Sequence, residues 1–107
     1  MIKYVALYRP PGDSAEFDRH YFDTHVPIFN KTPGLIRAEI ARVTRTMVGE
    51  PAYYLMAELY FESVETMKAA FKSAEWQESG RNLADWCGME LVTMFTAAVV
   101  DDGGADV

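Results

Sequence analysis

The chain has 107 residues, of which 50% are hydrophobic and 13% aromatic, so it can form one domain with a modest core and is too apolar to be disordered. Its formal net charge of -6 argues against a protein that binds nucleic acid or docks on an anionic membrane. Cys87 is the single cysteine, which excludes an internal disulfide, and with neither a signal peptide nor a membrane-length apolar run we expect a soluble cytoplasmic protein.

The first predicted elements are a strand and a helix. Residues 2–8 are rich in strand formers, and the proline-rich turn at 9–12 stops them because proline offers no N–H to a sheet. Asp13 then resembles a helix N-cap, with Glu16 three residues on as in a capping box. We expect the helix to run from about 14 to 24.

One face of this helix carries the most informative pattern in the chain. Phe17, Tyr21 and His25 are four residues apart, so they form a single stripe of rings along the helix. Pro27 disfavours the α conformation at the residue before it, which predicts a break or kink near His25. Pro33-Gly34 then predicts a turn. Aromatic rings and an imidazole on one face indicate the wall of a pocket.

The rest of the chain continues the alternation of strands and helices. Strand patterns at 35–46 and 53–61 should pair as a hairpin, and a last strand is expected at 89–100. Two serine-capped helices are expected between them, at about 64–72 and 74–86.

The resulting order is β-α-β-β-α-β, typical of the ferredoxin-like α+β fold with a four-stranded antiparallel sheet. Helices would cover only one face of that sheet. The least costly cover for the other face is the sheet of a second subunit, which gives a homodimer with a shared barrel. We expect one domain over residues 1–100 and a flexible acidic tail at 101–107.

The element order and the first helix also resemble the EthD family of the dimeric α/β-barrel superfamily. The residues that carry the resemblance are Phe17, Tyr21, His25, Pro27, Ile28, Pro33 and Gly34, followed by a weaker match at Phe71, Ser73 and Trp76. The resemblance implies a ferredoxin-like dimer with a ligand cavity between sheet and helices and with His25 at or near it. The founding member is linked to ethyl tert-butyl ether degradation, where its own activity is undefined. Similar barrels include muconolactone-type isomerases, polyketide cyclases and decarboxylases, and quinol- or haem-oxidising monooxygenases, so the resemblance implies a fold more than a reaction.

His25 is the candidate catalytic residue, because an imidazole at a pocket rim can exchange a proton near neutral pH. The structural alternative is that it bonds a carbonyl and holds the helix break. Tyr21, Trp76 and Tyr60 are the candidate substrate-binding residues. The alternative is a plain core role for Tyr21 and Trp76, and a place in the dimer interface for Tyr60. The sequence does not choose which sheet face lines the pocket.

The chain carries no recognisable cofactor or metal motif. His20 and His25 are five residues apart, which is poor spacing for two ligands on one helical face, and no zinc-binding pattern accompanies them. A glycine-rich phosphate loop, a serine elbow and a nucleotide fingerprint are also missing from the sequence. We therefore expect neither a metal nor a cofactor.

These observations favour a small cofactor-independent enzyme of the isomerase, cyclase or decarboxylase type. It would act on a flat, apolar, oxygenated compound by proton transfer through His25. The first alternative is a non-catalytic ligand carrier in an oxidative degradation pathway, and the second is a haem-linked or cofactor-free monooxygenase. A cavity-facing His25 beside a second polar group would favour the enzyme.

Overall fold

The computed structural model describes residues 1–86 and 88–101, so Cys87 and positions 102–107 of the predicted tail lie outside the described residues. The elements follow the predicted order. They are β1 (Ile2–Tyr8), α1 (Ser14–His20), a π-helical turn (Tyr21–His25), α2 (Val26–Phe29), β2 (Arg37–Arg42), β3 (Leu55–Phe61), α3 (Val64–Phe71), α4 (Ala74–Asp85), a 3₁₀ turn (Gly88–Glu90) and β4 (Val92–Ala98). No helix within the two described ranges has both the length and the apolar character to cross a membrane.

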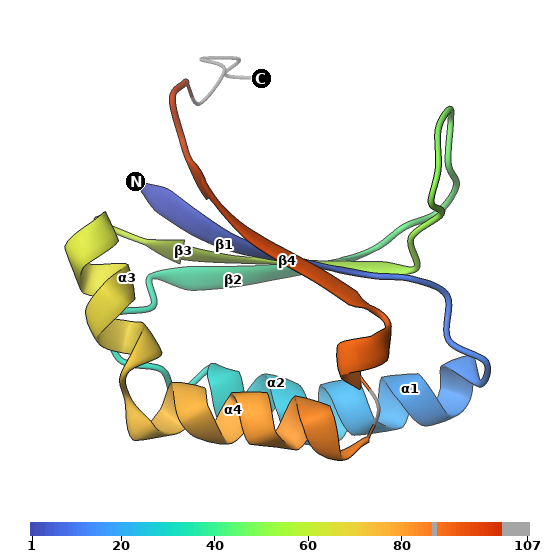
Figure 1. Ribbon diagram of the computed structural model, residues 1–107, viewed down its shortest axis with the longest axis horizontal. Coiled ribbons are helices and arrows are strands. Elements are labelled where there is room, and N and C mark those ends of the chain that lie inside the picture. The colour runs from blue at the N-terminus through green and yellow to red at the C-terminus, as the bar shows by residue number, and fades with distance from the viewer. Residues whose placement is uncertain (87, 102–107) are drawn as a thin grey trace.

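The strands form one four-stranded sheet in the order β2-β3-β1-β4, and each neighbouring pair is antiparallel. The helices all lie on one side of this sheet, and the other face is left open (Figure 1). The predicted ferredoxin-like α+β fold is confirmed. Since side chains alternate along a strand, Tyr4, Ala6 and Tyr8 face the helices while Val5 and Leu7 face the open side.

The first helical segment departs from the predicted break near His25. The helix does not end there but widens, so that the backbone N–H of Val26 bonds to the carbonyl of Tyr21, five residues earlier. Pro27 explains the position of this turn, because a regular α-helix would bring its ring against the carbonyl four residues back. The chain therefore passes Pro27 in helical form, and Tyr21 and His25 both stay buried.

Serine caps start the two later helices as predicted. The Oγ of Ser63 accepts a hydrogen bond from the backbone N–H of Thr66, and the Oγ of Ser73 accepts one from Trp76, at 3.1 and 3.2 Å. Each cap satisfies one of the backbone donors that a helix start leaves free. The second cap also fixes the first turn of α4, from which Trp76 projects.

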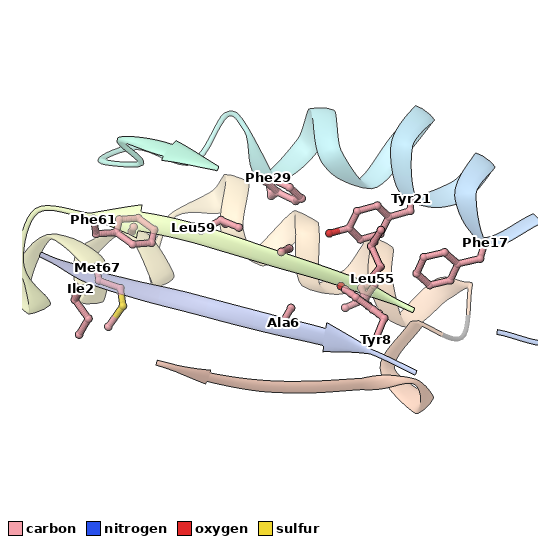
Figure 2. Close-up of a cluster of buried hydrophobic side chains, with 13 residues drawn as sticks. Ile2, Ala6, Tyr8, Phe17, Tyr21, Phe29, Leu55, Leu59, Phe61 and Met67 are labelled. Carbon is pink, nitrogen blue, oxygen red and sulfur yellow. The ribbon is translucent and has the colours of Figure 1, made fainter. Parts of the chain in front are cut away.

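The core lies between the sheet and the helices, where aromatic rings from both layers meet edge to face (Figure 2). Tyr8 of β1 contacts Phe17 and Tyr21, with ring centroids 5.4 and 5.3 Å apart. Such edge contacts add to the stabilisation from burial itself. The predicted stripe of Phe17, Tyr21 and His25 thus faces the sheet.

Candidate functional site

A cavity of about 230 Å³ lies between the helix-covered face of the sheet and the helices. The side chains on its floor are short, because the paired strand residues there are both alanines, Ala6 of β1 and Ala57 of β3. The lining residues whose side chains carry a polar group are Tyr4, Tyr8, Tyr21, His25, Trp76 and Ser79. Among the residues that the structure describes, no Lys, Arg, Asp or Glu lines the cavity.

Three of the four predicted site residues line this cavity together. His25 and Tyr21 enter from the π-helical turn, with ring centroids 5.4 Å apart, and Trp76 enters from α4. Tyr60 does not line it, which corrects the expectation that Tyr60 shapes the pocket. It follows the cavity-lining Leu59 by one residue and so points to the opposite face of the sheet, where the guanidinium of Arg37 lies 4.1 Å from the centre of its ring.

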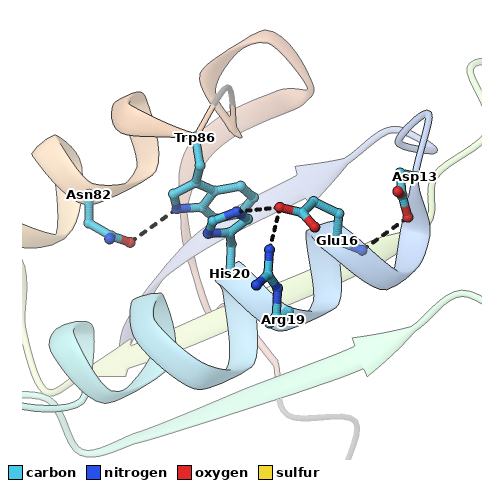
Figure 3. Close-up of polar contacts among 6 residues, drawn as sticks. All are labelled: Asp13, Glu16, Arg19, His20, Asn82 and Trp86. Atoms are coloured by element: carbon cyan, nitrogen blue, oxygen red, sulfur yellow. Dashed lines mark hydrogen bonds and ion pairs between the residues drawn. The ribbon is translucent and has the colours of Figure 1, made fainter.

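His20 lies outside the cavity, near the surface of α1. Its Nε2 is 3.0 Å from Glu16 Oε1, and its ring stacks on Trp86 at a centroid distance of 5.4 Å (Figure 3). Within residues 1–86 and 88–101, no group of three His, Cys, Asp or Glu side chains could hold a metal ion.

The tautomer of His25 follows from a hydrogen-bond chain that crosses from α4. The Oδ1 of Asn82 lies 3.2 Å from Trp86 Nε1 and 3.1 Å from His25 Nδ1 (Figure 3 draws the first of these contacts). An indole N–H can only donate, so the atom of Asn82 that it meets must be the carbonyl oxygen. That oxygen has no proton to give, and His25 must therefore donate from Nδ1. The opposite nitrogen, Nε2, then carries a free lone pair.

The electrostatic surroundings keep this ring neutral. Burial lowers the pKa of His25 below its usual value, and the hydrogen bond to Asn82 opposes part of that effect. Asn82 is outside the set of cavity-lining residues whereas His25 is within it, so the Nδ1 side of the ring is turned away from the cavity. A neutral imidazole with its basic nitrogen on the cavity side can accept a proton from a bound molecule.

The EthD domain, as a sequence family, matches residues 9–85, which is most of the chain. The chain belongs to the EthD family. This confirms the resemblance drawn from the first-helix motif. The matched range includes Tyr21, His25, Trp76 and Asn82 but excludes Tyr8 and Trp86, so part of the site lies outside the EthD match.

Two relatives match nearly the whole chain. An uncharacterised 11.0 kDa protein from the thcB–thcC intergenic region of Rhodococcus erythropolis is 31% identical over 96 residues, covering 90% of this chain and 93% of that protein. The crystal structure of an ethyl tert-butyl ether degradation (EthD) family protein from Bacillus halodurans has a TM-score of 0.86 at 35% identity, covering 94% of this chain and 99% of the other.

A more distant likeness extends to SnoaB, a cofactor-independent oxygenase from Streptomyces nogalater. Its structure has a TM-score of 0.65 at 14% identity and covers 98% of this chain and 97% of its own. At this identity the likeness concerns the fold, which the EthD chain shares with it.

Sequence reasoning assigned no site role to Asn82 and Trp86. Asn82 is 57 residues from His25 in the chain, and only the packing of α2 against α4 brings them together. One signal was available: asparagine is disfavoured inside a helix because its side chain competes for backbone bonds, so an interior Asn indicates a specific partner. Its spacing of four residues from Trp86 places the two on one helical face.

Proposed function

We propose that this EthD-family chain is a cofactor-independent enzyme that binds a small, flat, neutral compound in the cavity and moves a proton with His25. Isomerisation, cyclisation and decarboxylation are reactions that such a transfer can promote. The observation that carries the proposal is the held tautomer of His25, whose Nδ1 donates to Asn82 while Nε2 stays basic. Proton transfer by one positioned histidine typically contributes ~10²–10⁴-fold to a rate.

The lining of the cavity supports a neutral ligand. A carboxylate or an ammonium group would lose its hydration there without meeting an opposite charge, because the described lining holds no formally charged side chain. Ring edges from Tyr4 and Trp76, 4.9 Å apart at their centroids, offer contact to a flat apolar body. A cavity of about 230 Å³ suits a molecule of roughly one or two rings.

The surroundings of His25 support an enzyme over a passive carrier. Its Nδ1 is held by a side chain from another helix rather than by its own backbone, and a second polar group, Tyr21, lines the cavity beside it. The likeness in fold to a cofactor-independent oxygenase makes reaction with O₂ the alternative worth testing. Oxygen uptake in the presence of ligand would separate that reaction from simple proton transfer.

The test is hydrogen–deuterium exchange at carbon, which needs no knowledge of the natural substrate. Small cyclic ketones and lactones would be incubated with the protein in D₂O, and deuterium uptake next to the carbonyl would be followed by NMR. We expect the folded H25Q variant to exchange ~10²-fold or more slowly than the original chain. H20Q is the matched control, since His20 lies outside the cavity. Equal exchange by H25Q would remove the catalytic role.

We propose further that two copies associate through the open sheet face. That face carries apolar cross-strand pairs, Val5 with Phe95 and Leu7 with Met56, and Phe95 is 45% exposed. The segment 43–54 and residues 99–101 both rise on the open side of the sheet, where they would flank a partner (Figure 1). Exposed apolar surface of this kind is characteristic of an association site.

Light scattering after gel filtration tests the association. The original chain should elute as a dimer, and F95D should elute as a monomer because a desolvated carboxylate would lie in the interface. V64D is the control, since Val64 is 40% exposed at the start of α3, on the helical side of the sheet. A monomeric original chain at micromolar concentration would rule out this dimer.

A further inference from the structure

The hydroxyl of Tyr21 is a buried donor with nothing to bond. The side chain is 0% exposed, and its oxygen has no hydrogen-bond partner among the residues that the structure describes. Buried polar groups in folded proteins are almost always paired, so an orphan of this kind requires an explanation. The oxygen lies in a residue that lines the cavity, where a bound molecule could supply the missing acceptor.

A second tyrosine hydroxyl lies beside it. Tyr8 is 1% exposed, lines the same cavity and meets the Tyr21 ring edge to face, with centroids 5.3 Å apart. Figure 2 shows the hydroxyl oxygens of both residues directed into the space between the sheet and the helices. The two hydroxyls lie close enough for a weak side-chain interaction that affects each other's pKa, but no hydrogen bond of ordinary geometry joins them.

Both hydroxyls keep their protons over the whole physiological range. Burial raises the pKa of Tyr8 and the pKa of Tyr21 far above the ordinary value for a phenol. Two protonated hydroxyls in an apolar cavity are two donors, and their complement is one oxygen with two lone pairs. A carbonyl oxygen meets that description and brings no charge into the cavity.

We infer that the hydroxyls of Tyr21 and Tyr8 bind the carbonyl oxygen of the ligand, so that the substrate class is a neutral cyclic or aryl ketone with a removable proton next to the carbonyl. This inference deepens the proposed function and rests on it. It adds Tyr8, a residue outside the EthD match, to the site.

The position of His25 completes the chemistry. Its ring centroid is 5.4 Å from that of Tyr21 and both residues line the cavity, so the inferred pose of a ketone held by its oxygen at Tyr21 places the neighbouring carbon beside the imidazole. Nε2 takes the proton from that carbon, the electrons of the C–H bond form a carbon–carbon double bond, and the carbonyl π electrons move to oxygen. The resulting enolate oxygen accepts hydrogen bonds from the two tyrosines. Return of the proton from Nε2 to a different carbon of a conjugated enolate, or to the opposite face of the same carbon, restores the histidine and completes the isomerisation.

The two donors would act mainly on the enolate rather than on the ketone. Charge develops on that oxygen as the proton leaves, and donors fixed in an apolar site stabilise developing charge strongly. Tyr21 and Tyr8 are therefore expected to affect the rate of enolisation more than the affinity for ketone. The pair is also expected to select a ketone over a hydrocarbon of the same shape, because the hydrocarbon would leave both donors unpaired.

The test compares acetophenone with ethylbenzene, which has the same ring and chain length but no oxygen. Dissociation constants would be measured by calorimetry on the original chain, Y21F, Y8F and the control Y54F, whose hydroxyl donates to Asp18 outside the cavity. We expect the original chain and Y54F to prefer acetophenone by at least tenfold, and Y21F to lose most of that preference while still binding ethylbenzene. The carbonyl stretching band of bound acetophenone should shift to lower frequency in the original chain and shift back in Y21F.

The outcomes separate the two proposals. Equal binding of both compounds by the original chain, with an unshifted carbonyl band, would overturn the carbonyl site and leave an apolar binding cavity. Failure of both compounds to bind would contradict the proposed ligand-binding function, and the carbonyl site with it. The comparison within the original chain decides whether the cavity binds a carbonyl oxygen, and full retention of the preference by folded Y21F and Y8F would overturn the assignment to these two tyrosines.

Discussion

Replacing Tyr21 by phenylalanine should stabilise the unliganded protein. The substitution removes a hydroxyl that is fully buried and unpaired, and an unsatisfied buried hydroxyl typically costs ~1–3 kcal/mol. The ring and its contacts with Tyr8 and Phe17 are retained, so no apolar packing is lost. Removing one oxygen atom leaves a void of only about that atom's size, so the cavity cost is small. We expect a net gain of ~1–2 kcal/mol in the free energy of unfolding.

Urea unfolding followed by tryptophan fluorescence would measure this gain. With a slope of roughly 1–3 kcal/mol per molar urea, the midpoint should rise by roughly 0.3–2 M, and the melting temperature by about 4 °C or more per kcal/mol. Protein concentrations must be equal, because association would add to the apparent stability.

Tyr54 provides a comparison of opposite sign. Its hydroxyl donates to Asp18 Oδ1 at 2.8 Å, so Y54F removes a satisfied hydrogen bond to a charged group and should lose roughly 1 kcal/mol. The two substitutions are chemically identical and differ only in the partner of the lost oxygen. If Y21F is no more stable than the original chain, the Tyr21 hydroxyl is satisfied without ligand and the reasoning fails.

Three further substitutions test other parts of the structure. H25Q should lose less stability on acidification than the original chain. Burial lowers the pKa of His25 in the folded state, so the stability due to its neutral ring is complete above about pH 6.5 and is lost as the pH falls below that value. Unfolding measured at pH 7 and pH 5 would show the difference. S73A should cost ~0.5–2 kcal/mol by removing the cap that accepts from the Trp76 N–H, measured by thermal melting against the exposed control S14A. G34A should lower the free energy of unfolding by ~1–2 kcal/mol or more, because φ is +83° at Gly34 and a Cβ would lie 2.8 Å from Thr66 Cγ2. Adding T66S removes that methyl group, so the double variant should recover only the part of the loss due to the contact, as thermal melting would show.

Local signals along the chain were sufficient for the fold. Alternation predicted β1 with its observed ends, and the serines before α3 and α4 act as the caps that their positions indicated. The ends of edge strands were harder to predict. The edge strand β2 covers Arg37–Arg42, where a longer strand over 35–46 was expected. Strand ends depend on which neighbours are present to pair, and that information is not local.

The candidate site was predictable only where a single helix carries it. The four-residue spacing of Tyr21 and His25 was enough to place both on one face. Tyr60 was misplaced because both faces of β3 bear large apolar side chains, so alternation alone could not say which one faces the helices. Asn82 could not be paired with His25 from sequence, since their contact depends on how two distant helices pack.

The floor of the cavity has a consequence for how members of the family could diverge. The space under a ligand exists because Ala6 and Ala57 face each other in the sheet, and a Cβ at Gly80 above would meet nothing within 4 Å. The size of the cavity thus depends on the small residues at these three positions, which have no polar side-chain group. Under the proposed function, enlarging any of these three residues, or replacing either alanine by glycine, would change which ligands fit while Tyr21 and His25 are unchanged. A new ligand specificity could therefore arise by a single substitution that leaves the proposed catalytic residue unchanged.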